Sequence, residues 1–260
     1  RFRWLADFQP HTFTPLWLAF IIVINALGYR QRGGCMMLDR PAFFLLLFPI
    51  SAAFWWFFEY LNRFVQNWYY IGPHFSALEY FWYATLPFAT VLPAVLGLRD
   101  MLMSTRWLPQ RFDYFVPLRS PHPKTMATLI LSVSAVGLAG IGIWPNLLFP
   151  LLWVSPVLII VSLQTLMGER HLLSHLTVGN WTPLVTAALA ALICGLFWEM
   201  WNIFSLAKWK YSIPLVHRYA VFEMPLLGYA GYLPFGLQCA VVGSLLEGPA
   251  SVAAPKAVGP

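Results

Sequence analysis

Seven long apolar stretches alternate with short polar ones along this chain. Each has about 20 mostly apolar residues, which is the length that a helix needs to cross a lipid bilayer. The stretches lie at approximately 12–29, 41–62, 76–98, 125–144, 147–166, 183–206 and 221–246. Prolines such as Pro87 and Pro225 would break helices in water, but membrane helices tolerate them because neighbouring helices satisfy the freed carbonyl groups. The pattern predicts an all-α, polytopic transmembrane helix bundle of about seven helices.

The composition favours a membrane protein and excludes an ordinary water-soluble domain. Only 10% of the 260 residues are charged, against roughly 25% in soluble domains, and 59% are hydrophobic. The net charge of +6 comes from single basic residues between apolar runs, which form no stripe of the kind that binds nucleic acid. Membrane lipids, and not nucleic acid, are therefore the expected surroundings.

Lysine and arginine are distributed unequally between the two sides of the predicted bundle. If the stretches cross in alternate directions, ten of the 16 basic residues lie on the side of the polar segment 99–124. Basic residues are enriched on the cytoplasmic side, so 99–124 is predicted to be a cytoplasmic linker of a bacterial inner-membrane protein. The tail, 248–260, is rich in Pro, Gly and Ala and is predicted to be disordered.

The chain carries nearly the same motif twice. FFEYLNRFVQNWYYIGP at 57–73 aligns with FWEMWNIFSLAKWKYSIP at 197–214, and the flanking helices align as well. The matched pairs are Glu59 with Glu199, Asn62 with Asn202, Trp68 with Trp209, Tyr70 with Tyr211, and Glu79 with Glu223. Two tandem transmembrane repeats, 1–98 and 125–247, are therefore predicted to have arisen by duplication.

The number of helices in each repeat sets their relative orientation. The stretch at 125–144 has no counterpart in the first repeat, so we expect either a further helix before residue 1 or a linker role for this stretch. In both cases the two repeats enter the membrane in the same direction and are related by an axis along the membrane normal. Matching helices that ran in opposite directions would contradict this prediction.

Each repeat places a glutamate in strongly apolar surroundings. Glu59 and Asn62 are three residues apart and share one helix face, as do Glu199 and Asn202. A Trp-x-Tyr sequence follows each pair and would lie at the headgroup level of the outer leaflet. The expected site consists of the acids Glu59, Glu79, Glu199 and Glu223 and of the neighbouring side chains Asn62, Trp68, Tyr70, Asn202, Trp209 and Tyr211.

These acids have two interpretations. Carboxyl groups in a low-dielectric pocket can hold or pass protons or bind a polar or cationic ligand, and acids within membrane helices usually serve function. Alternatively, they cap helices or pair with Arg63, Lys208, Lys210 or Arg218. The second interpretation is stronger for Glu79 and Glu223, which begin helices and can satisfy free N–H groups there.

No sequence motif indicates a cofactor or a metal. The chain contains no G-x-G-x-x-G, P-loop, H-E-x-x-H or G-x-S-x-G sequence, so nucleotide, zinc-hydrolase and serine-hydrolase chemistry have no support. His171 and His175 are four residues apart but lack a third ligand, and a plain interface fits them better. We therefore expect neither a cofactor nor a metal ion.

The order of features in each half resembles the small membrane lycopene-cyclase domains of carotenoid biosynthesis. The likeness covers 57–88 and 197–235: an acid on an apolar helix, a Trp-x-Tyr, and a short loop into a Glu-led helix with Pro and Phe. Those domains have a Pro-x-Glu-Glu cluster at the second helix, where this chain has single glutamates in ALEYF and FEMPL. The resemblance implies acid-catalysed cyclisation of polyene ends without redox change. It makes Glu59, Glu79, Glu199 and Glu223 the catalytic candidates.

Three functions compete on this sequence, and whether the chain is an enzyme stays open. It could bind a long apolar ligand, such as an isoprenoid, carotenoid or lipid, beside the glutamates, with or without acid–base chemistry. It could instead be a non-catalytic structural or assembly subunit that contacts other membrane subunits. A transporter is the third function, although its acids would be expected near the bilayer midplane and not at one leaflet.

Overall fold

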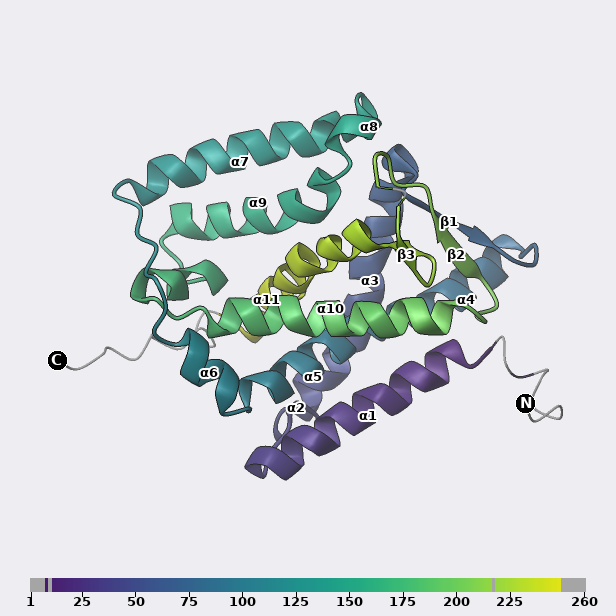
Figure 1. Ribbon diagram of the computed structural model, residues 1–260, viewed down its shortest axis with the longest axis horizontal. Coiled ribbons are helices and arrows are strands. Elements are labelled where there is room, and N and C mark those ends of the chain that lie inside the picture. Colours follow the sequence, from purple (N-terminus) through teal and green to yellow (C-terminus); the bar gives the residue numbers. More distant parts are fainter. Residues whose placement is uncertain (1–7, 9–10, 217, 249–260) are drawn as a thin grey trace.

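The computed structural model describes residue 8 and residues 11–216 and 218–248, and it is a bundle of long helices (Figure 1). The longer helices are α1 (Phe13–Arg32), α3 (Pro41–Val65), α4 (Ala77–Phe88), α5 (Val91–Met103), α7 (Pro123–Ala139), α9 (Leu151–Met167), α10 (Thr182–Asn202) and α11 (Tyr232–Glu247). Short helical turns are α2 (Met36–Asp39), α6 (Trp107–Phe112), η2 (Gly140–Gly142), α8 (Pro145–Leu148), η3 (Leu172–Val178) and η4 (Leu226–Gly231). The predicted disordered tail lies outside the described residues, apart from Gly248.

The prediction of a transmembrane helix bundle is confirmed. Six helical segments of the described chain are long and apolar enough to cross a membrane. The bent pair formed by α9 and η3 would be a seventh if it counts as one span. Helices of this number, length and composition are those of an integral membrane protein.

The predicted helix at 76–98 is in fact two helices, α4 and α5. The helix is interrupted after Phe88, and the side chain of Ser51 on α3 forms hydrogen bonds with backbone groups that the interruption leaves free. The Ser51 hydroxyl donates to the carbonyl oxygen of Phe88 at 2.6 Å and accepts from the N–H of Leu92 at 2.9 Å. A buried serine on a neighbouring helix therefore stabilises a kink in apolar surroundings.

Other predicted boundaries are also wrong by several residues. The last stretch is not helical from residue 221, because Ala220–Val221 (β3) and Met224–Pro225 (β4) form a small antiparallel hairpin before η4. Pro225 therefore lies in a strand and not within a helix. Helix α5 continues to Met103, and α6 occupies part of the segment that was predicted to be a linker.

Two short strands that the sequence prediction missed join the two halves of the chain. Trp68–Ile71 (β1) pairs antiparallel with Lys208–Tyr211 (β2). Trp68 lies opposite Tyr211, Tyr70 opposite Trp209, and Tyr69 opposite Lys210. Since Tyr69 and Lys210 hold equivalent positions in the two aligned motifs and pair with each other, the strands meet around a local two-fold axis, as identical subunits do in a dimer.

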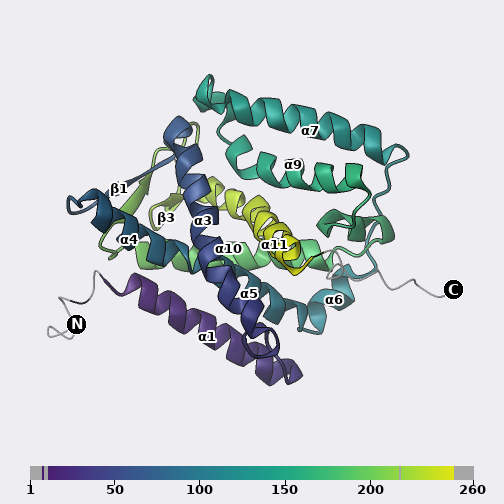
Figure 2. The same ribbon diagram turned by 180° about the vertical axis from the view of Figure 1, so that it is seen from behind.

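Matching helices begin or end at the same place, the strand pair. The first residue of α1, Phe13, contacts Trp209 of β2 with ring centroids 5.6 Å apart, and Trp153 near the start of α9 lies 5.7 Å from Trp68 of β1. Both helices thus begin beside the strand pair, whereas α3 and α10 end there, and Figures 1 and 2 show this arrangement from opposite sides. The duplication and the parallel orientation of the two repeats stay predictions.

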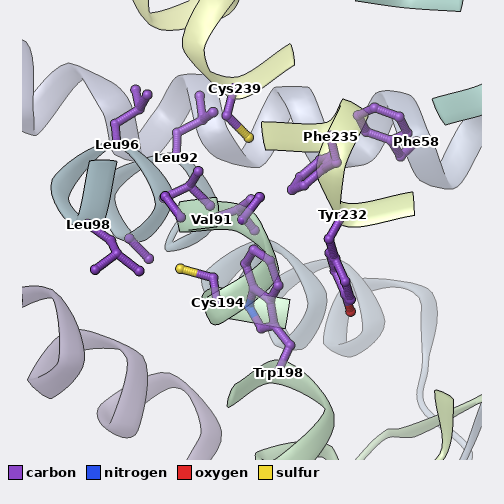
Figure 3. Close-up of a cluster of buried hydrophobic side chains, with 14 of the residues drawn as sticks. Phe58, Val91, Leu92, Leu96, Leu98, Cys194, Trp198, Tyr232, Phe235 and Cys239 are labelled. Carbon is purple, nitrogen blue, oxygen red and sulfur yellow. The ribbon is translucent and has the colours of Figure 1, made fainter. Parts of the chain in front are cut away.

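The apolar core lies where α5, α10 and α11 meet. Every residue from Val91 to Leu98 in α5 is buried, as expected of a central helix that is apolar on all sides. Figure 3 shows Leu92 and Leu96 of α5 near Cys239 of α11, and Phe235 beside Phe58 of α3. The hydroxyl group of Tyr232 points away from this cluster.

The close contact of α10 and α11 depends on Gly236. A Cβ atom there would overlap the carbonyl oxygen of Ala187 and lie 2.9 Å from the Cβ of Ala191. We expect Gly236→Ala to lower the free energy of unfolding by about 1–3 kcal/mol, because the two helices must separate. Thermal unfolding in detergent measures this change. The control is Gly28→Ala, where the nearest atoms are 3.9 Å from the added Cβ, and equal melting temperatures would contradict the prediction.

Candidate functional site

A cavity of about 470 Å³ lies between the two halves of the bundle, next to the strand pair. Its volume is within the range of roughly 300–1,000 Å³ that is typical of small-molecule sites. Its wall is largely aromatic, with contributions from both halves. The aromatic lining residues are Phe13, Trp55, Trp68, Tyr70, Phe75, Tyr80, Tyr83, Phe88, Trp153, Trp198, Trp209, Tyr211 and Tyr232, in addition to His11.

Glu59 lies behind this wall in the first half. Its Oε1 atom accepts hydrogen bonds from Trp55 Nε1 at 3.1 Å, from Trp68 Nε1 at 3.0 Å and from the Tyr70 hydroxyl at 2.5 Å. All three donors line the cavity. The carboxyl group of this half-buried residue is therefore connected to the cavity through aromatic N–H and O–H groups.

Glu199 occupies the corresponding place in the second half and is 0% exposed. Its Oε1 atom accepts from the hydroxyl groups of Tyr211 at 2.5 Å and Tyr232 at 2.8 Å, and Trp209 Nε1 donates to the Tyr211 hydroxyl at 2.8 Å. These three aromatic residues also line the cavity. The Oε2 atom of Glu199 makes no hydrogen bond within the described part of the chain.

Asn62 and Asn202 hold the strands that carry these donors. Asn62 Nδ2 donates to the carbonyl oxygen of Trp68 at 2.8 Å, and its Oδ1 accepts from the N–H of Asn67 at 2.8 Å. Asn202 Nδ2 donates to the carbonyl oxygen of Trp209 at 2.8 Å, and its Oδ1 accepts from the same residue's N–H at 2.9 Å. The two asparagines therefore position the aromatic wall through these hydrogen bonds. Neither asparagine belongs to the cavity lining itself.

The two strand tyrosines keep their protons. Burial raises the pKa of Tyr70 well above its usual value, and the neighbouring Glu59 raises it further. Burial and Glu199 raise the pKa of Tyr211 in the same way. Each hydroxyl group is thus a permanent donor to its carboxyl partner near neutral pH.

Glu79 and Glu223 make the structural contacts that the sequence had left as the alternative. Glu79 forms a capping box with Ser76: its Oε2 accepts from the Ser76 N–H at 2.9 Å and from the Ser76 hydroxyl at 2.7 Å. Glu223 forms an ion pair with Lys208 of β2. Neither Ser76 nor Lys208 lines the cavity, whereas the donors to Glu59 and Glu199 do, so the structure connects two of the four predicted acids to it.

The mouth of the cavity lies between the start of α1 and α4. The exposed lining residues are His11 and Pro15 at the start of α1 and Tyr80, Tyr83 and Leu86 on α4. Tyr83 is 46% exposed and Leu86 is 55% exposed, whereas the lining residues of the second half are buried or half-buried. The His11 and Tyr83 rings lie 6.3 Å apart. Both α1 and α4 belong to segments that are long and apolar enough to cross a membrane.

Sequence reasoning missed several residues of this site. Trp55 precedes Glu59 by one helical turn, so its place on the same face was available from the spacing. Tyr232 had no such signal, because it reaches Glu199 across 33 positions of the chain. Trp153 and Trp198 join the wall only through the packing of α9 and α10.

Comparisons with known proteins add no family or relative. No protein-family model matches the chain, no curated protein does, and no solved structure does. Within the described ranges, no three or more His, Cys, Asp or Glu side chains gather in a way that could hold a metal ion.

Proposed function

We propose that this integral membrane protein binds a long apolar ligand of the isoprenoid class, such as a carotenoid, in the aromatic cavity. The observation that carries the proposal is the largely aromatic lining of a cavity whose exposed residues lie on α1 and α4, two helices of membrane-spanning segments. A ligand that reaches such a mouth comes from the bilayer and is itself lipophilic. The ligand would therefore enter the cavity from the lipid bilayer.

The lining indicates a neutral, unsaturated ligand. Among the described lining residues there is no Lys, Arg, Asp or Glu, so the cavity has no ionic partner for a phosphate or an ammonium group. Flat aromatic side chains such as Trp55, Trp198 and Trp209 offer large apolar faces that suit a conjugated chain. A conjugated isoprenoid satisfies both conditions.

We further propose that Glu59 and Glu199 serve acid–base chemistry on this ligand. An isomerisation needs a group that gives a proton to one double bond and a group that removes a proton from a neighbouring carbon, and it leaves the composition of the ligand unchanged. Tyr70 and Tyr211 line the cavity and contact the two carboxyl groups, so each can relay a proton between ligand and acid by accepting one proton while it gives up another, and each stays protonated overall. The ring faces would stabilise the intermediate cation.

The resemblance to lycopene-cyclase domains is consistent with such an isomerisation. That resemblance named four acids, and the contacts to the cavity support Glu59 and Glu199 over Glu79 and Glu223. We also propose that the strand pair faces the outer side of a bacterial inner membrane and that 99–124 faces the cytoplasm. The excess of Lys and Arg on the side of 99–124 supports this orientation.

Extraction of bound lipids from purified protein tests the proposed ligand. We expect an isoprenoid to co-purify with the wild type and to be lost from Ala84→Trp, because the half-buried Ala84 lines the cavity near its mouth and an indole there would block it. Liquid chromatography with mass spectrometry measures the ligand per protein. Leu78→Trp is the matched control, since Leu78 is an exposed residue of the same helix outside the lining.

Two outcomes contradict the proposal. One is bulk lipid alone in the wild type, and the other is equal isoprenoid content in the wild type and in Ala84→Trp. If membrane subunits also co-purified in constant proportion with the wild type and both variants, the structural-subunit function would replace the proposed one.

A further inference from the structure

We propose that the Asn67 side chain binds a hydroxyl group at one end of the ligand, so that the ligand is an isoprenoid alcohol and not a pure hydrocarbon. This inference rests on the proposed function, because it specifies the ligand of the same cavity. Asn67 follows α3, lies directly before β1, and belongs to the cavity lining.

The backbone of Asn67 is held on both sides. Its N–H donates to Asn62 Oδ1 at 2.8 Å, and its carbonyl oxygen accepts from the N–H of Ser212 at 2.8 Å. The first contact ties the residue to α3, and the second ties it to the segment after β2. The side chain is therefore kept in the wall of the cavity by a rigid main chain.

The amide group of Asn67 has no hydrogen-bond partner in the described part of the protein. The residue is 1% exposed, and neither Nδ2 nor Oδ1 makes a hydrogen bond. A buried amide without partners costs free energy, and each such group in a folded protein calls for an explanation. A ligand that supplies the missing partner would remove the cost in the bound state.

The position of Asn67 separates it from the other buried polar groups without partners. Atoms of this kind also occur in Trp17, Arg99, Ser155, Gln164, His171, His175, Glu199 and Gln238. None of those residues belongs to the cavity lining, whereas Asn67 does. Both ends of its amide are free, one a donor and one an acceptor, and a hydroxyl group can satisfy both because it donates and accepts.

The second half of the chain offers no equivalent group. Asn67 directly precedes Trp68, and the residue directly before the matching Trp209 is Lys208, which forms an ion pair with Glu223 and does not line the cavity. Ala207, the residue before Lys208, lines the cavity, but its methyl group cannot form hydrogen bonds. Among the described lining residues, a buried amide without partners thus occurs in the first half only, and the two halves would bind the two ends of a ligand differently.

A pair of probes that differ by one hydroxyl group tests this inference. The probes are all-trans-retinol and the hydrocarbon that has hydrogen in place of its hydroxyl group, delivered from phosphatidylcholine vesicles to the reconstituted full chain. Energy transfer from the wall tryptophans to the polyene reports binding of both. We expect the wild type to bind retinol about tenfold more tightly than the hydrocarbon, and Asn67→Leu to abolish this preference while still binding the hydrocarbon.

Two further variants and a stability measurement separate binding from folding. Asn67→Ala is expected to lose the preference in the same way, whereas Ala207→Val should change the affinity for both probes equally. The melting temperature of Asn67→Leu without ligand should equal or exceed that of the wild type, because the substitution removes an unpartnered amide.

Each failure has a distinct meaning. If the wild type binds both probes equally, or if Asn67→Leu keeps the preference for retinol, the hydroxyl assignment is overturned, the amide is satisfied by water alone, and the proposed apolar-ligand function stands. If neither probe binds the wild type, the proposed function falls together with this inference.

Discussion

Replacing both Glu59 and Glu199 with glutamine is expected to leave the ligand bound but to reduce its chemical conversion by about a hundredfold or more. Glutamine keeps the size of the side chain and can still accept from Tyr70 and Tyr211, so the aromatic wall should hold its shape. It can neither give up nor take a proton in the way a carboxyl group does. Production of the protein in a host that makes an acyclic carotenoid, followed by chromatography of the membrane pigments, measures the conversion.

Glu79→Gln is the matched control for the double variant. Glu79 lies in the same predicted repeat as Glu59, and it is exposed and caps α4 outside the cavity lining. We expect this control to convert the pigment as the wild type does. Equal conversion by the wild type and the double variant would show that the two acids take no part in the reaction. Loss of conversion in Glu79→Gln would return catalysis to the four-acid cluster that the sequence predicted.

Asn202→Ala is expected to lower the free energy of unfolding by about 2–4 kcal/mol. The residue is 0% exposed, and its amide makes two hydrogen bonds, at 2.8 and 2.9 Å, with the backbone of Trp209. Alanine leaves the N–H and the carbonyl group of Trp209 without these partners in apolar surroundings. Thermal unfolding in detergent measures the loss. Asn62→Ala should behave similarly, because Asn62 holds Trp68 in the same way.

Asn146→Ala serves as the control for both asparagine variants. Asn146 is an exposed residue of α8, and alanine there is expected to change stability by no more than about 0.5 kcal/mol. A melting temperature for Asn202→Ala that matches the control would mean that β2 holds its place without this side chain. The pairing with β1 alone would then stabilise the strand.

Much of the site could be predicted from the repeated motif. The pairs Glu59 with Asn62 and Glu199 with Asn202 share helix faces because three residues make nearly one helical turn, and the structure shows both pairs next to the strand pair. The capping role of Glu79 could be recognised because Ser76 precedes it by three residues. These relations are local, so residue spacing alone expresses them.

The remaining features depend on contacts between distant parts of the chain. Strands β1 and β2 have four residues each and lie between long apolar helices. Four positions are too few to show the alternation of apolar and polar residues that predicts a strand. The division of α4 from α5 depends on Ser51, which belongs to another helix. The residues of the stretch 76–98 therefore could not reveal it. The same holds for Tyr232, whose hydroxyl completes the surroundings of Glu199 from α11.

The apolar stretches alone require a membrane helix bundle, because a chain with 10% charged residues cannot cover itself in water and unpaired backbone groups cannot persist in lipid. The two matched motifs likewise identify Glu59 and Glu199 as corresponding residues before any fold is known. The cavity, its mouth between α1 and α4, and the ion pair of Glu223 with Lys208 follow only from the packing of distant segments. The reason is physical: hydropathy depends on the residues of one segment, whereas a cavity is the space that side chains from several segments leave unfilled.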